Sequence, residues 1–216
     1  MKRFIGVLLA IFLCGCASPS GKVTGLIAPS PEPIRTVTMP DITATLFQCQ
    51  LDPVEQPPWP VQTLRPNEYD PETGLHMTGR PQYIDLAAYR LNVTGRVGHP
   101  LSLTYDQVRC LPRVTDHPEL VCPGVFKDYA TWTGVPVKVL VEMAGVQKEA
   151  TLLTLVSADG YETKLPLELA TADGNFLAYE LKGKPLPVKH GFPLRAVFPT
   201  MPGAKWIKWI VELWVT

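Results

Sequence analysis

One stretch near the middle of the chain reads Trp132-Thr-Gly-Val-Pro136-Val-Lys-Val-Leu-Val-Glu-Met-Ala-Gly145. Pro136 suits the start of a helix, because the first backbone N–H groups of a helix have no partner inside it. Apolar side chains then recur with helical spacing, at Val137, Leu140, Val141 and Ala144. Gly145 is typical of the left-handed residue that ends many helices. The stretch therefore predicts a short helix with one buried face.

Ahead of this helix, the sequence predicts one strand and another short helix. Residues 89–97 alternate apolar and polar side chains, which is typical of a strand with one buried face. Thr104 and Gln107 have the spacing of a capping box. We expect a helix to begin there and to turn Val108 and Leu111 toward the core.

Further strands are expected downstream, at residues 151–157, 161–165, 176–181 and 194–198. An Asp-Gly turn at residues 159–160 joins the first two. In the last strand, one face is expected to hold Ile207, Trp209, Val211, Leu213 and Val215. The opposite face then holds Trp206, Lys208, Ile210, Glu212 and Trp214. These elements predict an α+β fold, a single mixed domain of short strands with two or three small helices.

The composition fits one folded domain and argues against nucleic acid as a partner. A chain of 216 residues is long enough for one core. Its 20 basic and 20 acidic residues cancel, so it has no electrostatic reason to bind nucleic acid. Its 23 prolines fit a loop-rich protein, and residues 41–85 are expected to be coil with one or two short strands.

The N-terminus has the pattern of an export signal. A basic Met1-Lys-Arg3 segment precedes an apolar run at residues 4–13, which is too short to span a bilayer. The run ends in Leu13-Cys-Gly-Cys16, which resembles the bacterial lipobox. That resemblance implies lipidation of Cys16, and Ala17 after it favours the outer membrane. The alternative is an ordinary signal peptide that happens to contain two cysteines.

These signals divide the chain into three parts. Residues 1–15 are expected to be the signal peptide. Residues 16–40 are rich in Pro, Ser, Gly and Thr and are expected to be a lipidated flexible tether. Residues 41–216 form the expected domain. The predicted location is the bacterial cell envelope, with the domain on the periplasmic side of the outer membrane.

Three cysteines remain after this division: Cys49, Cys110 and Cys122. An exported protein meets an oxidising compartment, so two of them can pair. We favour Cys49 with Cys110, which leaves Cys122 free; the alternative is Cys110 with Cys122. No spacing typical of a structural zinc site is present.

Several short segments occur in an order that resembles a known family. Nine residues separate Cys122 from the Trp-x-Gly-Val-Pro segment that begins at Trp132. The segments are Tyr89–Val97, Pro100–Thr104, Leu120–Cys122, Trp132–Pro136, Asp159–Tyr161, Leu177–Pro187, His190–Arg195 and Gly203–Trp209. Together, over residues 89–216, they resemble the molybdopterin-binding domain of the sulfite-oxidase family. Because each segment alone is unspecific, the resemblance depends on their shared order.

The resemblance implies a molybdenum-molybdopterin cofactor and gives Cys122 a role. In that family, molybdenum is held by two dithiolene sulfurs of the pterin and one cysteine thiolate. Cys122 then becomes the molybdenum ligand, and a soft thiolate suits such a metal. The alternative is that Cys122 is a small buried hydrophobic residue.

The resemblance also implies a phosphate-binding group made of Arg195, Lys205 and Lys208, with His190 as a further hydrogen-bond donor. Arg195 would offer a planar fork to the pterin phosphate. The alternative is a solvated basic edge, and we expect Lys208 to be the most exposed of the three. For His190 the alternative is a turn residue before Gly191.

The sequence also departs from the family. An Arg-Asn-His segment that packs on the pterin in relatives is missing, and His76 is the nearest substitute. Near the cysteine, Asp128 and Tyr129 are the candidates for a general acid or base by proximity alone. The export signal resembles one for unfolded chains, whereas molybdopterin is inserted in the cytoplasm. Either the signal is an atypical twin-arginine one, or the domain has lost its cofactor.

Two functions follow. The first is a lipid-anchored molybdopterin oxidoreductase that transfers an oxygen atom to or from a small substrate such as a sulfoxide or sulfite. It would exchange electrons with a separate redox partner, because the chain contains no heme attachment motif. The alternative is a cofactor-free binding or scaffolding lipoprotein that retains the fold. A disulfide at Cys122 would exclude the first function.

Overall fold

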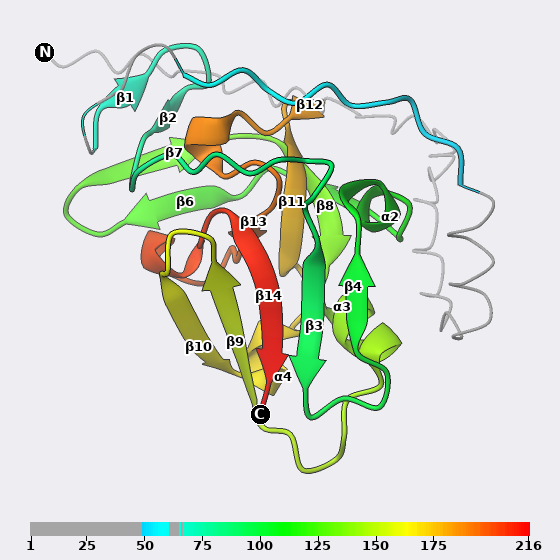
Figure 1. Cartoon of the computed structure of the whole chain (residues 1–216). Coiled ribbons are helices and arrows are strands. Elements are labelled where there is room, and N and C mark those ends of the chain that lie inside the picture. Colours follow the sequence, from blue (N-terminus) through cyan, green and yellow to red (C-terminus); the bar gives the residue numbers. More distant parts are fainter. Residues whose placement is uncertain (1–48, 61–64, 66) are drawn as a thin grey trace, which may run out of the picture. The chain divides into compact units, whose positions relative to one another are not determined.

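A computed structural model describes residues 49–60, 65 and 67–216 (Figure 1). The expected signal peptide, the tether and Cys16 lie outside the described residues. Within the described part of the chain, no helix is both long and apolar enough to cross a membrane.

The first of two larger sheets has the strand order β10-β9-β14-β3-β4. Its strands are β3 (Leu91–Gly95), β4 (Leu101–Leu103), β9 (Leu152–Ser157), β10 (Glu162–Pro166) and β14 (Ile210–Val215). Strand β14 runs parallel to β3 and antiparallel to β9, so the end of the chain lies inside the sheet. The predicted strands at 89–97, 151–157 and 161–165 are confirmed.

The second sheet has the order β12-β11-β8-β5, with β13 also paired to β11. Its strands are β5 (Val114–Asp116), β8 (Trp132–Pro136), β11 (Phe176–Leu181), β12 (Lys184–Pro185) and β13 (Arg195–Val197). Strand β8 carries the Trp-Thr-Gly-Val-Pro segment. A Cβ atom on Gly134 would lie 2.0 Å from the Leu177 carbonyl oxygen of β11. Only glycine therefore allows these two strands to approach so closely.

Two small hairpins lie side by side, and they position the candidate site (Figure 1). One joins β1 (Tyr69–Asp70) to β2 (Leu75–His76), and the other joins β6 (Glu119–Cys122) to β7 (Phe126–Tyr129). The sequence predicted one or two short strands in the first region but did not predict the second hairpin.

Two helices begin where the sequence predicted, and the second of them also ends there. Helix α2 (Tyr105–Arg109) has Thr104 as its N-cap, and both hydrogen bonds of the capping box to Gln107 are present. Helix α3 (Val137–Ala144) follows Pro136 and ends at Gly145, which has a φ of 65°. A third helix, α4 (Leu167–Ala170), is short. The predicted fold class, a single mixed α+β domain with few helices, is confirmed.

The final strand differs from the prediction at its start. It begins at Ile210 rather than Ile207, and the register with β9 shifts between Ile210 and Glu212. Ahead of it, Trp209 has a φ of 53°, so the chain turns there. The predicted alternation holds only at the end, where Leu213 and Val215 are buried and Trp214 is exposed. A regular period of two requires continuous extended backbone, which the turn interrupts.

The residues before this strand are therefore buried on both predicted faces. Trp206 and Trp209 are each 2% exposed, and their indole N–H groups donate to the carbonyl oxygens of Phe198 and Val188.

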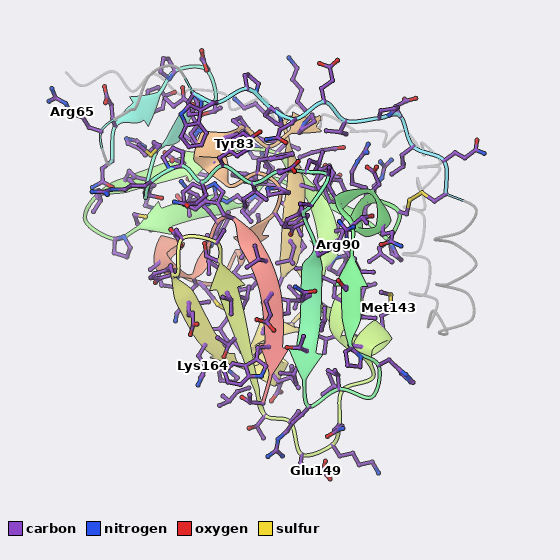
Figure 2. The ribbon with its side chains drawn as sticks, in the orientation of Figure 1. Arg65, Tyr83, Arg90, Met143, Glu149 and Lys164 are labelled. Carbon is purple, nitrogen blue, oxygen red and sulfur yellow. A yellow bond between two sulfur atoms is a disulfide. The ribbon has the colours of Figure 1, made fainter. Side chains whose placement is uncertain are left out.

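Elsewhere, Cys49 forms a disulfide with Cys110, at the end of helix α2 (Figure 2).

Candidate functional site

Cys122 ends strand β6 and carries a free, partly exposed thiol. The residue packed against it is Gly203, at the start of the 3-10 helix η2 (Gly203–Lys205). A Cβ atom on Gly203 would lie 2.6 Å from the Cys122 Sγ and 3.1 Å from the Leu120 Cδ1. The thiol therefore fills the space that a side chain at position 203 would need. Its partial exposure sets it apart from a cysteine that serves only as core packing.

The charges around Cys122 act in opposite directions on its thiol. Burial raises the pKa of Cys122, and the Asp128 carboxylate raises it further. The Arg195 and Lys208 cations lower the pKa but do not outweigh these effects. A metal ion bound at the sulfur adds the positive charge that deprotonates a coordinating thiol.

Arg195, on strand β13, is buried at 3% exposure. Its Nη1 and Nη2 donate to the carbonyl oxygens of His190 and Trp206, at 3.2 and 3.4 Å. The guanidinium lies over the Trp132 ring, 4.6 Å from the ring centroid. Burial lowers the pKa of Arg195 to about 10, which leaves it charged at neutral pH. Its Nε is buried without a hydrogen-bond partner among the described residues, so the group retains an unused donor.

Lys208 is 7% exposed, so the expectation that it would be the most exposed of the three cations was wrong. The turn at Trp209 places it inside the protein rather than on the outer face of a strand. Its Nζ donates to the carbonyl oxygens of Thr78, at 2.6 Å, and Lys189, at 3.0 Å. Burial and then the Arg195 charge hold the pKa of Lys208 well below its usual value. Lys205 is only partly buried, and its Nζ donates to the Thr163 hydroxyl at 2.9 Å.

His190 ends the 3-10 helix η1 (Val188–His190) and is fully buried. Its Nε2 lies 2.9 Å from Asp70 Oδ2 and 2.8 Å from Thr73 Oγ1. Burial, and then the charge of Lys208, lowers the pKa of His190 to about 3, so the ring is neutral at neutral pH. With its proton on Nε2 facing the carboxylate, Nδ1 is an acceptor, which differs from the donor expected from the sequence. Nδ1 has no partner among the described residues.

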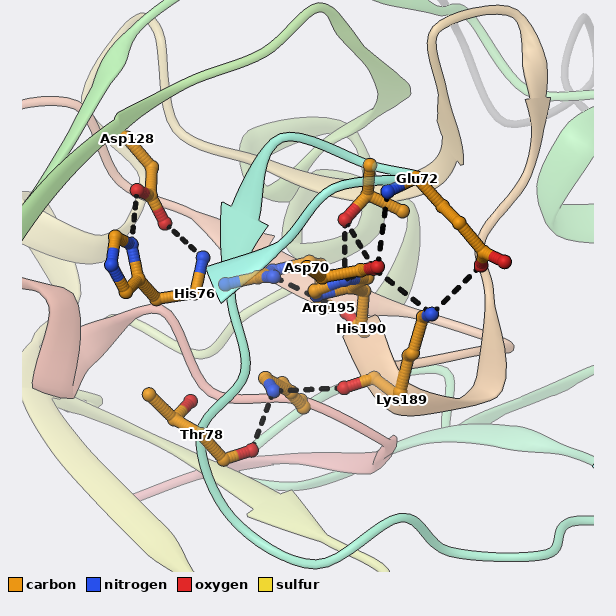
Figure 3. A network of polar contacts seen from close by, with 10 residues as sticks. Asp70, Glu72, His76, Thr78, Asp128, Lys189, His190 and Arg195 are labelled. Carbon is orange, nitrogen blue, oxygen red and sulfur yellow. Dashed lines mark hydrogen bonds and ion pairs between the residues drawn. The ribbon is translucent and has the colours of Figure 1, made fainter. Parts of the chain in front are cut away.

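The segment 69–79 connects these groups (Figure 3). Asp70 binds His190 and accepts from Lys189, His76 binds Asp128, and the Thr78 carbonyl accepts from Lys208. Burial opposes ionisation of Asp70, but hydrogen bonds from Thr73, His190 and Lys189 outweigh it and lower its pKa to about 2. Asp70 and Thr78 were not predicted from the sequence, because nothing in a proline-rich segment indicates which residues a later part of the chain will contact.

A pocket of about 250 Å³ lies beside this network. It is lined by Thr78, Gly79, Ser157, Asp159, Tyr161, Gly203, Ala204, Trp206, Ile207, Lys208 and Trp209. Of the residues predicted from the sequence, Lys208 lines the pocket. Gly203 also lines it and contacts the Cys122 thiol, so the pocket and the thiol are separated by one residue.

These features define a class of site. A partly exposed thiol, two buried cations and unused polar atoms on Arg195 and His190 fit an anionic cofactor that carries a metal. The chain matches the family model described as oxidoreductase molybdopterin binding domain over residues 77–216, and it belongs to that family. The family and its molybdenum-molybdopterin cofactor, both expected from the sequence, are confirmed. The expected class of enzyme, a molybdopterin oxidoreductase, is confirmed with them.

Three relatives illustrate the similarity. The uncharacterized oxidoreductase YuiH of Bacillus subtilis is 37% identical over 63% of this chain and 71% of its own. A putative protein-methionine-sulfoxide reductase subunit, YedZ1 of Azospira oryzae, is 30% identical over 62% of this chain and 51% of its own. Human mitochondrial sulfite oxidase is 29% identical over 74% of this chain and 37% of its own.

A solved structure supports the fold. The sulfane dehydrogenase SoxCD from Paracoccus pantotrophus matches with a TM-score of 0.60 and 26% identity, over 65% of this chain and 41% of that one. The chain thus spans about half or less of several proteins that it resembles.

Proposed function

We propose that this domain transfers an oxygen atom to or from a small sulfur compound, a sulfoxide or sulfite, with Cys122 as its molybdenum ligand. The observation that carries the proposal is the Cys122 thiol, which is free, partly exposed and packed on a glycine, with Arg195 and Lys208 acting on its charge. When bound, the cofactor supplies the two-electron chemistry.

The buried cations would hold the anionic part of the cofactor. Arg195 offers its unused Nε–H, and its guanidinium lies over the Trp132 ring, a cation–π contact that restrains its position. Lys208 lies at the pocket wall and has one further N–H beyond its two carbonyl partners. Lys205 is the weaker candidate because it is less buried. His190 would accept a hydrogen bond through Nδ1.

The choice of substrate class follows from the relatives. The names of three of them refer to sulfur chemistry: methionine sulfoxide, sulfite and sulfane. One of these relatives is named as a subunit, which supports a separate redox partner for this chain. A small sulfur compound is therefore the substrate we propose, with electrons exchanged with another protein.

We also propose that the chain is anchored by lipid at Cys16 in the bacterial envelope and faces the periplasm. The Cys49–Cys110 disulfide supports this location, because disulfides persist in oxidising compartments. Labelling with a radioactive fatty acid should mark the wild-type protein and not Cys16→Ser. Equal labelling of both would contradict the anchor.

The activity is tested with protein purified from its own host. Sulfoxide reduction is followed with a reduced viologen dye, and sulfite oxidation with an artificial electron acceptor. One of these activities is expected, and Cys122→Ser should lack it while keeping the same fold by circular dichroism. Molybdenum-loaded protein without either activity would contradict the proposed substrate class. Full activity in Cys122→Ser would contradict the ligand.

A further inference from the structure

His76, at the end of strand β2, is fixed in one orientation by four contacts, of which Figure 3 shows the two to Asp128. Its Nδ1 lies 2.7 Å from Asp128 Oδ1, and its backbone N–H donates to Asp128 Oδ2 at 2.6 Å. Its ring stacks on Phe126, with centroids 4.4 Å apart and planes 9° apart. Tyr69 packs edge-on from the other side, with centroids 5.4 Å apart. A side chain that only filled space would not need a buried carboxylate to orient it.

The same face of the β6–β7 hairpin carries the Cys122 thiol. Cys122 pairs with Phe126, and Leu120 pairs with Asp128. Opposed residues of an antiparallel pair project to the same face. Phe126 is the residue directly opposite Cys122, and the His76 imidazole stacks on it. The imidazole therefore lies on the face of the hairpin that carries the thiol. Tyr129, a candidate from the sequence, projects to the other face, where it is 55% exposed and bonds Glu119.

The ring edge away from Asp128 is accessible. The His76 side chain is 25% exposed, whereas that of Asp128 is 2% exposed. Nδ1 is bound to the Asp128 carboxylate. The other ring nitrogen, Nε2, makes no hydrogen bond within the described ranges. A carboxylate on one nitrogen fixes the orientation and the tautomer, and leaves the other nitrogen for proton exchange.

We propose that His76 is a catalytic residue, the proton donor to the oxygen atom that leaves a sulfoxide substrate, and that Asp128 is its positioning residue. This assignment rests on the proposed function. A sulfoxide, two protons and two electrons give a sulfide and one water molecule. The sulfur–oxygen bond breaks and two oxygen–hydrogen bonds form. The electrons come from a reduced protein electron carrier. His76 acts as the imidazolium: Nδ1–H stays on the Asp128 carboxylate, Nε2 gives up its proton to the leaving oxygen, and Nε2 takes a proton back from solvent. Water supplies the other proton.

The test uses the molybdenum-loaded protein and a sulfoxide with a reduced dye. His76→Gln should lower kcat about 100-fold, the lower range for loss of a general acid, with metal content and KM little changed. His117→Gln is the matched control, because His117 is also near this hairpin and stacks on Tyr129, but is exposed, and its ring Nδ1 bonds the Thr131 hydroxyl rather than a carboxylate. Exogenous imidazole should restore part of kcat in His76→Ala.

A second measurement does not depend on activity. Nitrogen NMR of the imidazole should show the proton on Nδ1 in the wild type, and Asp128→Asn should weaken this preference. An active wild type with kcat unchanged in His76→Gln would overturn the role of His76 alone. A loaded wild type that oxidises sulfite but reduces no sulfoxide would overturn the role of His76 and leave the proposed function standing. A loaded wild type with neither activity would overturn both.

Discussion

The contact between Gly203 and Cys122 gives the sharpest prediction. An added Cβ at position 203 would lie 2.6 Å from the Cys122 Sγ, a separation that real Cβ atoms essentially never show. The structure must shift to admit it, and overpacking of this kind costs about 1–3 kcal/mol of unfolding free energy. We therefore expect Gly203→Ala to destabilise the metal-free protein by about 2 kcal/mol.

A double-mutant cycle measures how much of this cost comes from the Cys122 Sγ. In a Cys122→Ala background the Sγ is gone, and the nearest atoms are the Leu120 Cδ1 at 3.1 Å and the Val121 carbonyl oxygen at 3.2 Å. The cost of Gly203→Ala should then fall by at least half, so the two changes should couple by about 1 kcal/mol. Urea unfolding followed by tryptophan fluorescence measures all four proteins. Gly98→Ala is the control, because its added Cβ would meet only the Gly145 oxygen at 3.4 Å. Equal costs in both backgrounds would show that the Cys122 Sγ is not what opposes a side chain at position 203.

Three further predictions concern the disulfide, His190 and Arg195. Replacing Cys49 and Cys110 by serine should cost up to about 4 kcal/mol, because the disulfide closes a loop with a sequence separation of 61; an unchanged urea midpoint would contradict this. Because the pKa of His190 is about 3 in the folded state, its ring binds a proton below pH 6.5 in the unfolded chain but stays neutral in the folded one. Between pH 6 and 4, the unfolding free energy of the wild type should therefore fall by about 1.4 kcal/mol per pH unit more than that of His190→Gln. An equal pH dependence of the two proteins would exclude His190 as the cause. Arg195→Lys removes the unused Nε–H and the two N–H groups that bond backbone carbonyl oxygens, and it should lower molybdenum content several-fold with the Cys122 thiol still present. Full metal content would argue against its cofactor role.

The local elements were predictable because their causes are local. The capping box at Thr104 and the Pro136–Gly145 helix depend on a few neighbouring residues, and both are present as expected. The final strand was predicted to begin at least three residues too early, because its pattern did not reveal the turn at Trp209. That turn is also why Lys208 is buried rather than exposed.

The site was only partly predictable for a different reason. Cys122 and Arg195 were identified through the order of segments, which reflects the family rather than any local rule. The contacts of Asp70 with His190 and of His76 with Asp128 join residues 120 and 52 positions apart. No spacing in the sequence specifies such pairs, since the fold alone brings them together.

The role of Cys122 is tested most directly by the molybdenum content of the protein purified from its own host, combined with X-ray absorption at the metal. We expect about one molybdenum per chain, with a protein sulfur among the ligands that is lost in Cys122→Ser. Metal-free protein, from a host that loads its other molybdenum enzymes, would contradict it.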